Sequence, residues 1–181
     1  TADPTLYDFD GAESLWIQGA PDQRWSWERQ TPVGRQLDGA PSPPNAWVTA
    51  LQGDSSRYDT GEFSFVVSPC FDLTRLTRPM VSLDLNYDLD PDFHGVALQY
   101  TLDDGANWRT LGTPTGATTS TGLNWYAPNG IFVSLGDADG RRFGWRGSSQ
   151  GWQRSALRLD ERLGDTLTSL QLRIVLESDA N

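Results

Sequence analysis

Alternation of apolar and polar residues with a period of two is the sequence feature that most constrains this chain. In the run VSLDLNYDL, which starts at Val81, apolar side chains alternate with Ser, Asp and Asn. This pattern is typical of an antiparallel strand with one face in the core and the other in water. The runs VALQYTL, from Val96, and SLQLRIVLE, from Ser169, repeat it. Several such strands, separated by loops rich in Gly, Pro, Asp and Thr, predict an all-β antiparallel sandwich.

The alternation also predicts which side chains point inward. These are Val81, Leu83, Leu85, Tyr87 and Leu89 in the first run, Val96, Leu98, Tyr100 and Leu102 in the second, and Leu170, Leu172, Ile174 and Leu176 in the third. GEFSFVVS, GIFVSL and AWVTAL are shorter strand candidates, and SALRLDERLGD is the best helix candidate. We expect residues 1–181 to form a single domain, because this length suits one domain better than two.

Charge and composition exclude several classes of function. The formal net charge of −10 disfavours nucleic acid, whose phosphates are bound by basic patches. All fourteen basic residues are Arg, so a P-loop lysine, a Schiff base and a lysine general base are excluded. The single cysteine, Cys70, cannot form an intrachain disulfide. No apolar run of about 18 residues is present, so no membrane span is predicted.

The stretch TLDDGANW has the chemistry of a hairpin turn, because Asp tolerates the turn and Gly105 supplies a positive φ. With Thr in place of Ser, Thr101, Asp103, Gly105 and Trp108 resemble the Asp box of sialidase repeats. That resemblance implies that the hydroxyl and the carboxylate brace the turn while the indole packs beneath it. Sialidases carry several copies and this chain has one, so we interpret the motif as a structural hairpin.

A single Asp box inside a predicted sandwich indicates another family. The landmarks follow in the order AWVTAL, SPCFDLT, RPMVSLDLNYDLD, HGVALQYTLDDGANW, NWY, GWRGSSQGW and SLQLRIVLESD. This order, over residues 45–179, resembles the MAM-like jelly-roll modules of bacterial secreted proteins, which are similar to the reelin repeat. The resemblance implies an extracellular or cell-surface binding and adhesion module without catalytic activity. Its partners would be a glycan or other cell-surface ligand and neighbouring domains of the same polypeptide.

Two features depart from that family pattern. His94-Gly95 stands where such modules usually carry Asp-Gly. In the family, the strand that matches SLQLRIVLESD is followed by one more strand, whereas this sequence stops at Asn181. We therefore expect a jelly roll that lacks its last strand, with an open edge near Tyr7–Phe9. A truncation, an insertion that splits the domain, or strand donation from a neighbour would each explain this.

Carboxylates in two segments are candidate ligands for calcium. YDFDGAES, with Asp8, Asp10 and Glu13, resembles the segment in which jelly-roll modules hold one structural calcium ion. DLDPDFHG, with Asp88 and Asp90, opens like a calcium loop, as does GDADGRR. Neither loop completes the twelve-residue pattern, and a solvated turn is the alternative for each. We expect calcium, where it binds, to stabilise the fold and not to catalyse.

Aromatic residues beside Gly- and Asn-rich loops are the candidate ligand-binding residues. These are Trp125, Tyr126, Trp145 and Trp152. Exposed flat rings could stack on a sugar, whereas in small sandwiches Trp usually belongs to the core or its rim. Solvent exposure of these rings decides between the two interpretations.

The loop GSSQG fits the Gly-x-Ser-x-Gly nucleophile elbow, with Ser149 as the nucleophile. The elbow requires a strand before it and a helix after it, and the only histidine, His94, precedes the serine. A hydrolase is therefore an alternative function of a different class. A structural accessory domain of a secreted protease is a further alternative.

Overall fold

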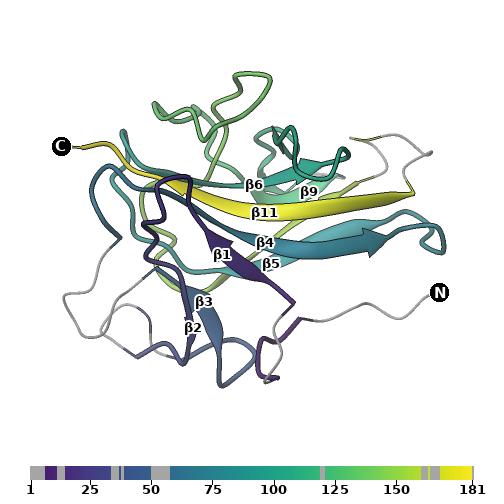
Figure 1. Ribbon diagram of the computed structural model, residues 1–181, viewed down its shortest axis with the longest axis horizontal. Coiled ribbons are helices and arrows are strands. Elements are labelled where there is room, and N and C mark those ends of the chain that lie inside the picture. Colours follow the sequence, from purple (N-terminus) through teal and green to yellow (C-terminus); the bar gives the residue numbers. More distant parts are fainter. Residues whose placement is uncertain are drawn as a thin grey trace.

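The computed structural model describes residues 7–11, 15–33, 37, 39–49, 58–118, 121–159, 163 and 168–180. Every element with defined bounds in these ranges is a β-strand, and all strand pairs are antiparallel (Figure 1). The strands form open sheets packed on a shared core. The prediction of an all-β antiparallel sandwich is therefore confirmed, whereas the jelly-roll connectivity remains a prediction.

The larger sheet has the strand order β1-β4-β11-β6-β7. The bounds of its strands are Ile17–Gly19 (β1), Phe63–Asp72 (β4), Ser169–Glu177 (β11), Gly95–Thr101 (β6) and Arg109–Thr110 (β7). β11 lies between β4 and β6 and pairs with both over most of its length, with a register shift between Gln171 and Arg173 on the β4 side (Figure 1). The last strand in chain order is thus the centre of the sheet.

The second sheet has the order β5-β10-β9-β8. The bounds of its strands are Met80–Leu85 (β5), Gln153–Arg158 (β10), Gly122–Trp125 (β9) and Gly116–Thr118 (β8). A separate two-stranded sheet pairs β2, Glu28–Gln30, with β3, Ala46–Val48. It lies below the larger sheet in the view of Figure 1.

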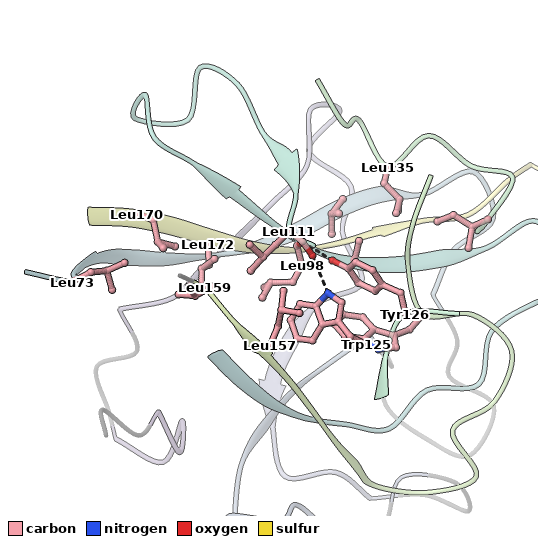
Figure 2. Packing of buried hydrophobic residues seen from close by; sticks show 14 residues of the cluster. Leu73, Leu98, Leu111, Trp125, Tyr126, Leu135, Leu157, Leu159, Leu170 and Leu172 are labelled. Carbon is pink, nitrogen blue, oxygen red and sulfur yellow. Dashed lines mark hydrogen bonds between the residues drawn. The ribbon is translucent and has the colours of Figure 1, made fainter. Parts of the chain in front are cut away.

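Much of the first core cluster lies between the two larger sheets, whereas Leu135 of this cluster lies on the opposite face of the larger sheet (Figure 2). Leu98 of β6 and Leu172 of β11 pack there together with Trp125 of β9 and Leu157 of β10. All four side chains are buried. Burial of large apolar side chains from both sheets is the main term that holds such a sandwich together.

The second core cluster is built around Trp16, Trp27, Val66, Leu89 and Leu176, which are all buried. Since Val66 and Leu176 belong to β4 and β11, the second core cluster rests on the larger sheet. The rings of Tyr7 and Phe9 pack edge-on against Trp16, at centroid distances of 6.0 and 5.7 Å. Tyr7–Phe9 thus contribute side chains to this cluster and lie outside the described strands. Among those strands, β1 pairs with β4 alone.

Segment 131–137 covers the other face of the larger sheet. Gln99 of β6 donates a hydrogen bond from Nε2 to Leu135 O at 2.9 Å, and Leu135 N donates to the carboxylate of Glu177 in β11. Gln99 is consequently buried, and Thr101 is buried as well, although the alternation assigned both to the solvent face. Leu102, predicted to point inward, is 55% exposed because it lies past the end of β6.

Two predicted elements differ from the structure. GIFVSL, residues 130–135, was expected to be a strand, but it lies outside the described strands, and the φ of 55° at Leu135 is incompatible with one. The first part of SALRLDERLGD belongs to strand β10 and is not helical. Within its remainder, Leu163 N donates to Leu159 O at 2.9 Å, a bond of helical spacing, and most of the other residues lie outside the described ranges.

Candidate functional site

One end of the sandwich gathers loops from three parts of the chain. β4 and β6 begin there and β11 ends there, since Phe63 pairs with Glu177 and Glu177 pairs with Gly95. Ser178 N donates to Glu62 O at 2.9 Å, which ties the segment after β11 to the segment before β4. Loops at the end of a rigid sandwich are a common place for binding residues.

The buried carboxylate of Glu62 organises this end of the sandwich. Its Oε1 accepts hydrogen bonds from Ser26 N and Ser26 Oγ, both at 2.8 Å, and from Ser64 Oγ. Its Oε2 accepts one from Asp59 N at 2.9 Å. A buried charge with this many donors is well compensated. Glu62 therefore acts as a structural anchor between three segments.

His94 joins two further segments through both nitrogens of its ring. Its Nδ1 lies 2.7 Å from Tyr58 Oη and its Nε2 lies 3.1 Å from Asp179 Oδ1. The neutral ring with a proton on Nε2 satisfies both contacts, because Nδ1 then accepts from the phenol and Nε2 donates to the carboxylate. The imidazole is thus held in place and presents no free nitrogen to a substrate.

Phe93, the neighbour of His94, forms an exposed ring pair with Phe132. The two rings stack with their centroids 5.6 Å apart and their planes at 28°. Phe93 is 49% exposed and Phe132 is 61% exposed. We call these two rings the Phe93/Phe132 pair.

Hydrogen bonds brace both loops that carry the Phe93/Phe132 pair. Asp90 Oδ1 accepts from Asp92 N and Phe93 N at 2.9 Å each, and these bonds lower the pKa of Asp90. Arg146 Nη1 donates to Pro91 O and, at 3.3 Å, to Asp92 Oδ1. Phe132 N donates to Asp92 O at 3.3 Å, which links the two loops.

Three of the four aromatic residues predicted to bind a ligand lie in the first core cluster. Trp125, Tyr126 and Trp145 are 0%, 4% and 1% exposed, and their rings contact one another at centroid distances of 4.8 to 5.3 Å. Figure 2 shows Trp125 and Tyr126 facing Leu98 and Leu111. A buried ring cannot stack on a sugar, so the prediction is wrong for these three residues.

Trp152, the fourth predicted ring, is half-buried. Its indole Nε1 donates to Gly39 O at 3.0 Å, so the ring is tied to the loop between β2 and β3. The exposed aromatic side chains among the described residues are instead Trp25, Phe93 and Phe132, and the last two stack on each other. None of the three was predicted to bind a ligand. Phe93 directly follows the turn residues PD, and Phe132 comes two residues after the turn residues NG. An aromatic residue beside such a turn is the sequence signal that could have identified Phe93 and Phe132.

The Asp-box residues form the hairpin between β6 and β7. Thr101 Oγ1 donates to Asp103 Oδ1 at 2.7 Å and accepts from Gly105 N at 3.0 Å. Asn107 donates to Asp103 from both its backbone and its side-chain nitrogen. The hydrogen bonds from Asn107 and Thr101 lower the pKa of Asp103 to about 2. Trp108 packs against the guanidinium of Arg173, 4.6 Å from its ring centroid.

The described carboxylates of the first predicted calcium segment accept hydrogen bonds from their own chain. Asp8 Oδ1 accepts from Asp10 N at 3.1 Å, and Asp10 Oδ1 accepts from Asn45 N at 2.9 Å. Arg29 Nη1 donates to Phe9 O at 3.1 Å and to Gly11 O, so a guanidinium already occupies the carbonyl oxygens between these carboxylates.

The remaining predicted calcium ligands lie apart from that segment or outside the described ranges. Asp88 is exposed and forms an isolated bridge with Ser148, while Asp90 accepts the turn hydrogen bonds described above. Glu13 is outside the described residues. Across the described part of the chain, no three His, Cys, Asp or Glu side chains gather as a metal site.

Ser149 of the GSSQG loop braces the end of β5. Its Oγ accepts from Tyr87 N at 2.9 Å and lies 3.3 Å from Asn86 Oδ1. Both ring nitrogens of His94 are engaged by Tyr58 and Asp179. The described residues therefore assemble no serine–histidine pair of the kind that activates a nucleophile.

Comparisons with protein-family models, curated proteins and solved structures find no match to this chain. The described residues contain no helix that is long and apolar enough to cross a membrane.

Proposed function

We propose that this protein is a non-catalytic binding module whose ligand surface is the Phe93/Phe132 pair. The observation that carries the proposal is a stacked, exposed pair of rings on two loops that hydrogen bonds hold in place. Contiguous exposed apolar surface on a soluble domain is typical of an interaction site. Rigid aromatic residues are also the side chains that contribute most to binding energy at interfaces.

A carbohydrate on a cell surface is the ligand that we propose. An aromatic ring can cover the apolar C–H face of a sugar, and charged side chains beside it can bind the hydroxyl groups. Arg146 and Asp92 form an ion pair at 3.3 Å next to Phe93 and supply such groups. As part of this proposal, the module acts outside the cell within a larger secreted protein.

The polar groups at this end of the sandwich support binding more than catalysis. Glu62 and His94, the groups best suited to proton transfer, make hydrogen bonds to their own chain. A general base needs a free position within hydrogen-bonding distance of the proton that it removes. In this geometry the polar network fixes the loops, and the exposed rings meet the ligand.

A glycan array followed by titration calorimetry tests the proposal. We expect at least one glycan to bind, and Phe93→Ala and Phe132→Ala each to weaken its affinity about ten-fold or more. Met80→Ala is the matched control. Met80 is 59% exposed and is the first residue of β5, whereas the loop that carries Phe93 follows the last residue of β5, Leu85. Absence of glycan binding, or equal binding by all three variants, would contradict the proposal and favour a structural accessory domain.

A further inference from the structure

Arg173 is a buried arginine in the middle of β11. The residue is 6% exposed and lies on the face of the larger sheet that segment 131–137 covers. Its guanidinium carbon lies 4.6, 5.1 and 5.9 Å from the ring centroids of Trp108, Phe65 and Phe63. Burial lowers the pKa of Arg173 to about 10, and the charge of Asp137 acts in the opposite direction.

Most of the hydrogen-bond donors of this guanidinium lack an acceptor among the described residues. Only Nε donates, to Gln99 Oε1 at 2.8 Å. None of the ion pairs within the described ranges includes Arg173. The carboxylate of Asp137 accepts hydrogen bonds from the backbone N–H groups of Thr110, Asp139 and Arg141. The positive charge of Arg173 thus has aromatic neighbours but, among the described residues, no anion within ion-pair distance.

The terminal nitrogens of Arg173 keep contact with solvent. Among the described residues, the side-chain nitrogen and oxygen atoms that are both fully buried and without a hydrogen-bond partner belong to other residues. Because the terminal nitrogens of Arg173 also lack a partner there, they are not fully buried. Gly136 lies between Nη2 and the ring of Phe63, and a methyl group there would come within 3.7 Å of Nη2 and 2.8 Å of the Phe63 ring. The edge of the guanidinium that points away from Gln99 is therefore the part that a small group can reach.

We propose that Arg173 binds the carboxylate group of a ligand through its two terminal nitrogens. The planar fork of a guanidinium matches the two oxygens of a carboxylate, and such bidentate pairs are strong and directional. A ligand carboxylate would also neutralise a buried charge that is otherwise unpaired, which is costly for a folded protein.

The surroundings of Arg173 fix the guanidinium before a ligand arrives. Trp108, Phe65 and Phe63 lie around the guanidinium, and Gln99 holds Nε. Gln99 is itself held by its hydrogen bond to Leu135 O. A group that is already ordered loses little conformational entropy on binding, so the ligand gains affinity.

This site uses none of the residues in the Phe93/Phe132 pair, so it goes beyond the proposed function and can fail separately from it.

Nuclear magnetic resonance of the arginine Nε–H groups in the unaltered, nitrogen-15-labelled protein tests the proposed carboxylate site directly. The probes are acetate, glucuronate and N-acetylaspartate, with glucose as the neutral match for glucuronate. We expect a saturable shift of the Arg173 signal with at least one carboxylate and none with glucose. The carboxylate that binds Arg173 most tightly shows whether a sugar acid or an acidic side chain is the better ligand.

Two variants and a control complete the experiment. Arg173→Lys keeps the charge but loses the fork, so we expect affinity for the carboxylate to fall about ten-fold or more. We expect Arg173→Met to lose the response completely. The matched control is Arg154→Met, because Arg154 pairs with Asp84 on the surface and should leave binding unchanged.

The proposal is overturned if no carboxylate shifts the Arg173 signal, if glucose shifts it equally, or if Arg173→Met still binds. Because the first titration uses the unaltered protein, the answer does not depend on whether the variants fold.

Discussion

The two core clusters differ in how they satisfy their buried polar atoms. In the first core cluster, Trp125 Nε1 donates to Leu111 O at 2.9 Å, Tyr126 Oη donates to Leu98 O at 2.8 Å, and Trp145 Nε1 donates to Asn124 O at 3.0 Å. In the second core cluster, the buried indole nitrogens of Trp27 and Trp47 have no acceptor among the described residues. Directional bonds therefore fix the rings of the first cluster, whereas burial of apolar area holds those two indoles of the second.

The difference follows from where the rings lie in the sheets. Leu111 and Asn124 lie just after β7 and within β9, where carbonyl groups face the core. The second core cluster is flanked by the short strands β2 and β3 and by residues 7–11, and the hydrogen bonds of Glu62 lie at its edge. We infer that substitutions in the first core cluster are strongly destabilising. We also infer that the hydrogen bonds of Glu62 stabilise the second core cluster, as the hydrogen bonds of the indoles stabilise the first.

Trp125→Ala should have the largest effect, because it removes a fully buried ring and leaves a cavity. We expect a loss of about 3–5 kcal/mol in the free energy of unfolding, measured by urea denaturation. Trp152→Ala, at a half-buried ring, is the control and should cost clearly less. Equal losses for the two variants would contradict the assignment of Trp125 to the centre of the core.

Glu62→Gln should cost about 1–3 kcal/mol, since the amide nitrogen of Gln would meet donors where the carboxylate accepted hydrogen bonds. The same urea denaturation measures it, with Glu28→Gln on the half-buried strand β2 as the control. If Glu62→Gln were as stable as the unaltered protein, the second region would not depend on this carboxylate.

Alkaline pH should weaken the first core cluster selectively. Burial raises the pKa of Tyr126 above its ordinary value of 10.0, so the folded protein keeps a proton that the unfolded chain releases. The free energy of unfolding should therefore fall by about 1.4 kcal/mol per pH unit above pH 10, with no such term below it. Urea denaturation from pH 9 to 11 should give a shallower fall for Tyr126→Phe. Identical slopes for the two proteins would refute this.

A matched pair of substitutions compares the two clusters directly. Trp145→Phe and Trp27→Phe each remove a buried indole, but only Trp145 loses a hydrogen bond. We expect Trp145→Phe to be more destabilising by about 1 kcal/mol. A difference of zero, or of the opposite sign, would show that the bonded indoles do not distinguish the clusters.

Calcium should have the smallest effect. Because Arg29 already binds the carbonyl groups of Phe9 and Gly11, we expect the same melting temperature in calcium and in EDTA. A ligand that binds only the folded state raises its stability. A rise in melting temperature with calcium would therefore show that a site exists despite this guanidinium.

The strands with clear alternation were predictable, because a half-buried strand needs one apolar face. SLQLRIVLE matches β11 along its full length. The burial of Gln99 and Arg173 was not predictable, because Gln99 is covered by segment 131–137 and Arg173 by Trp108, and alternation within a strand does not report such contacts. Thr101 is buried within the Asp-box hairpin of which it is a part. Local periodicity carries no information about a second layer on the same sheet.

The candidate site was less predictable than the fold. Composition around Trp125, Tyr126 and Trp145 resembles that of a ligand platform, yet the strand ends place all three rings inside. Phe93 and Phe132 are far apart in the sequence and meet only because their loops end at the same edge of the sandwich. Such a pairing is a property of the tertiary fold, because the turn beside each residue does not show that the two rings meet.

The central position of β11 has a consequence for how the protein is made. β4 and β6 do not pair with each other, and both depend on β11, which is synthesised last of the described strands, with Phe63 opposite Glu177. A ribosome thus releases most of the chain before the larger sheet can close, and pairing between such distant segments is slow. Until then the apolar edges of β4 and β6 are open to neighbouring nascent chains. Production of this domain should therefore depend strongly on chaperones and on low temperature during synthesis.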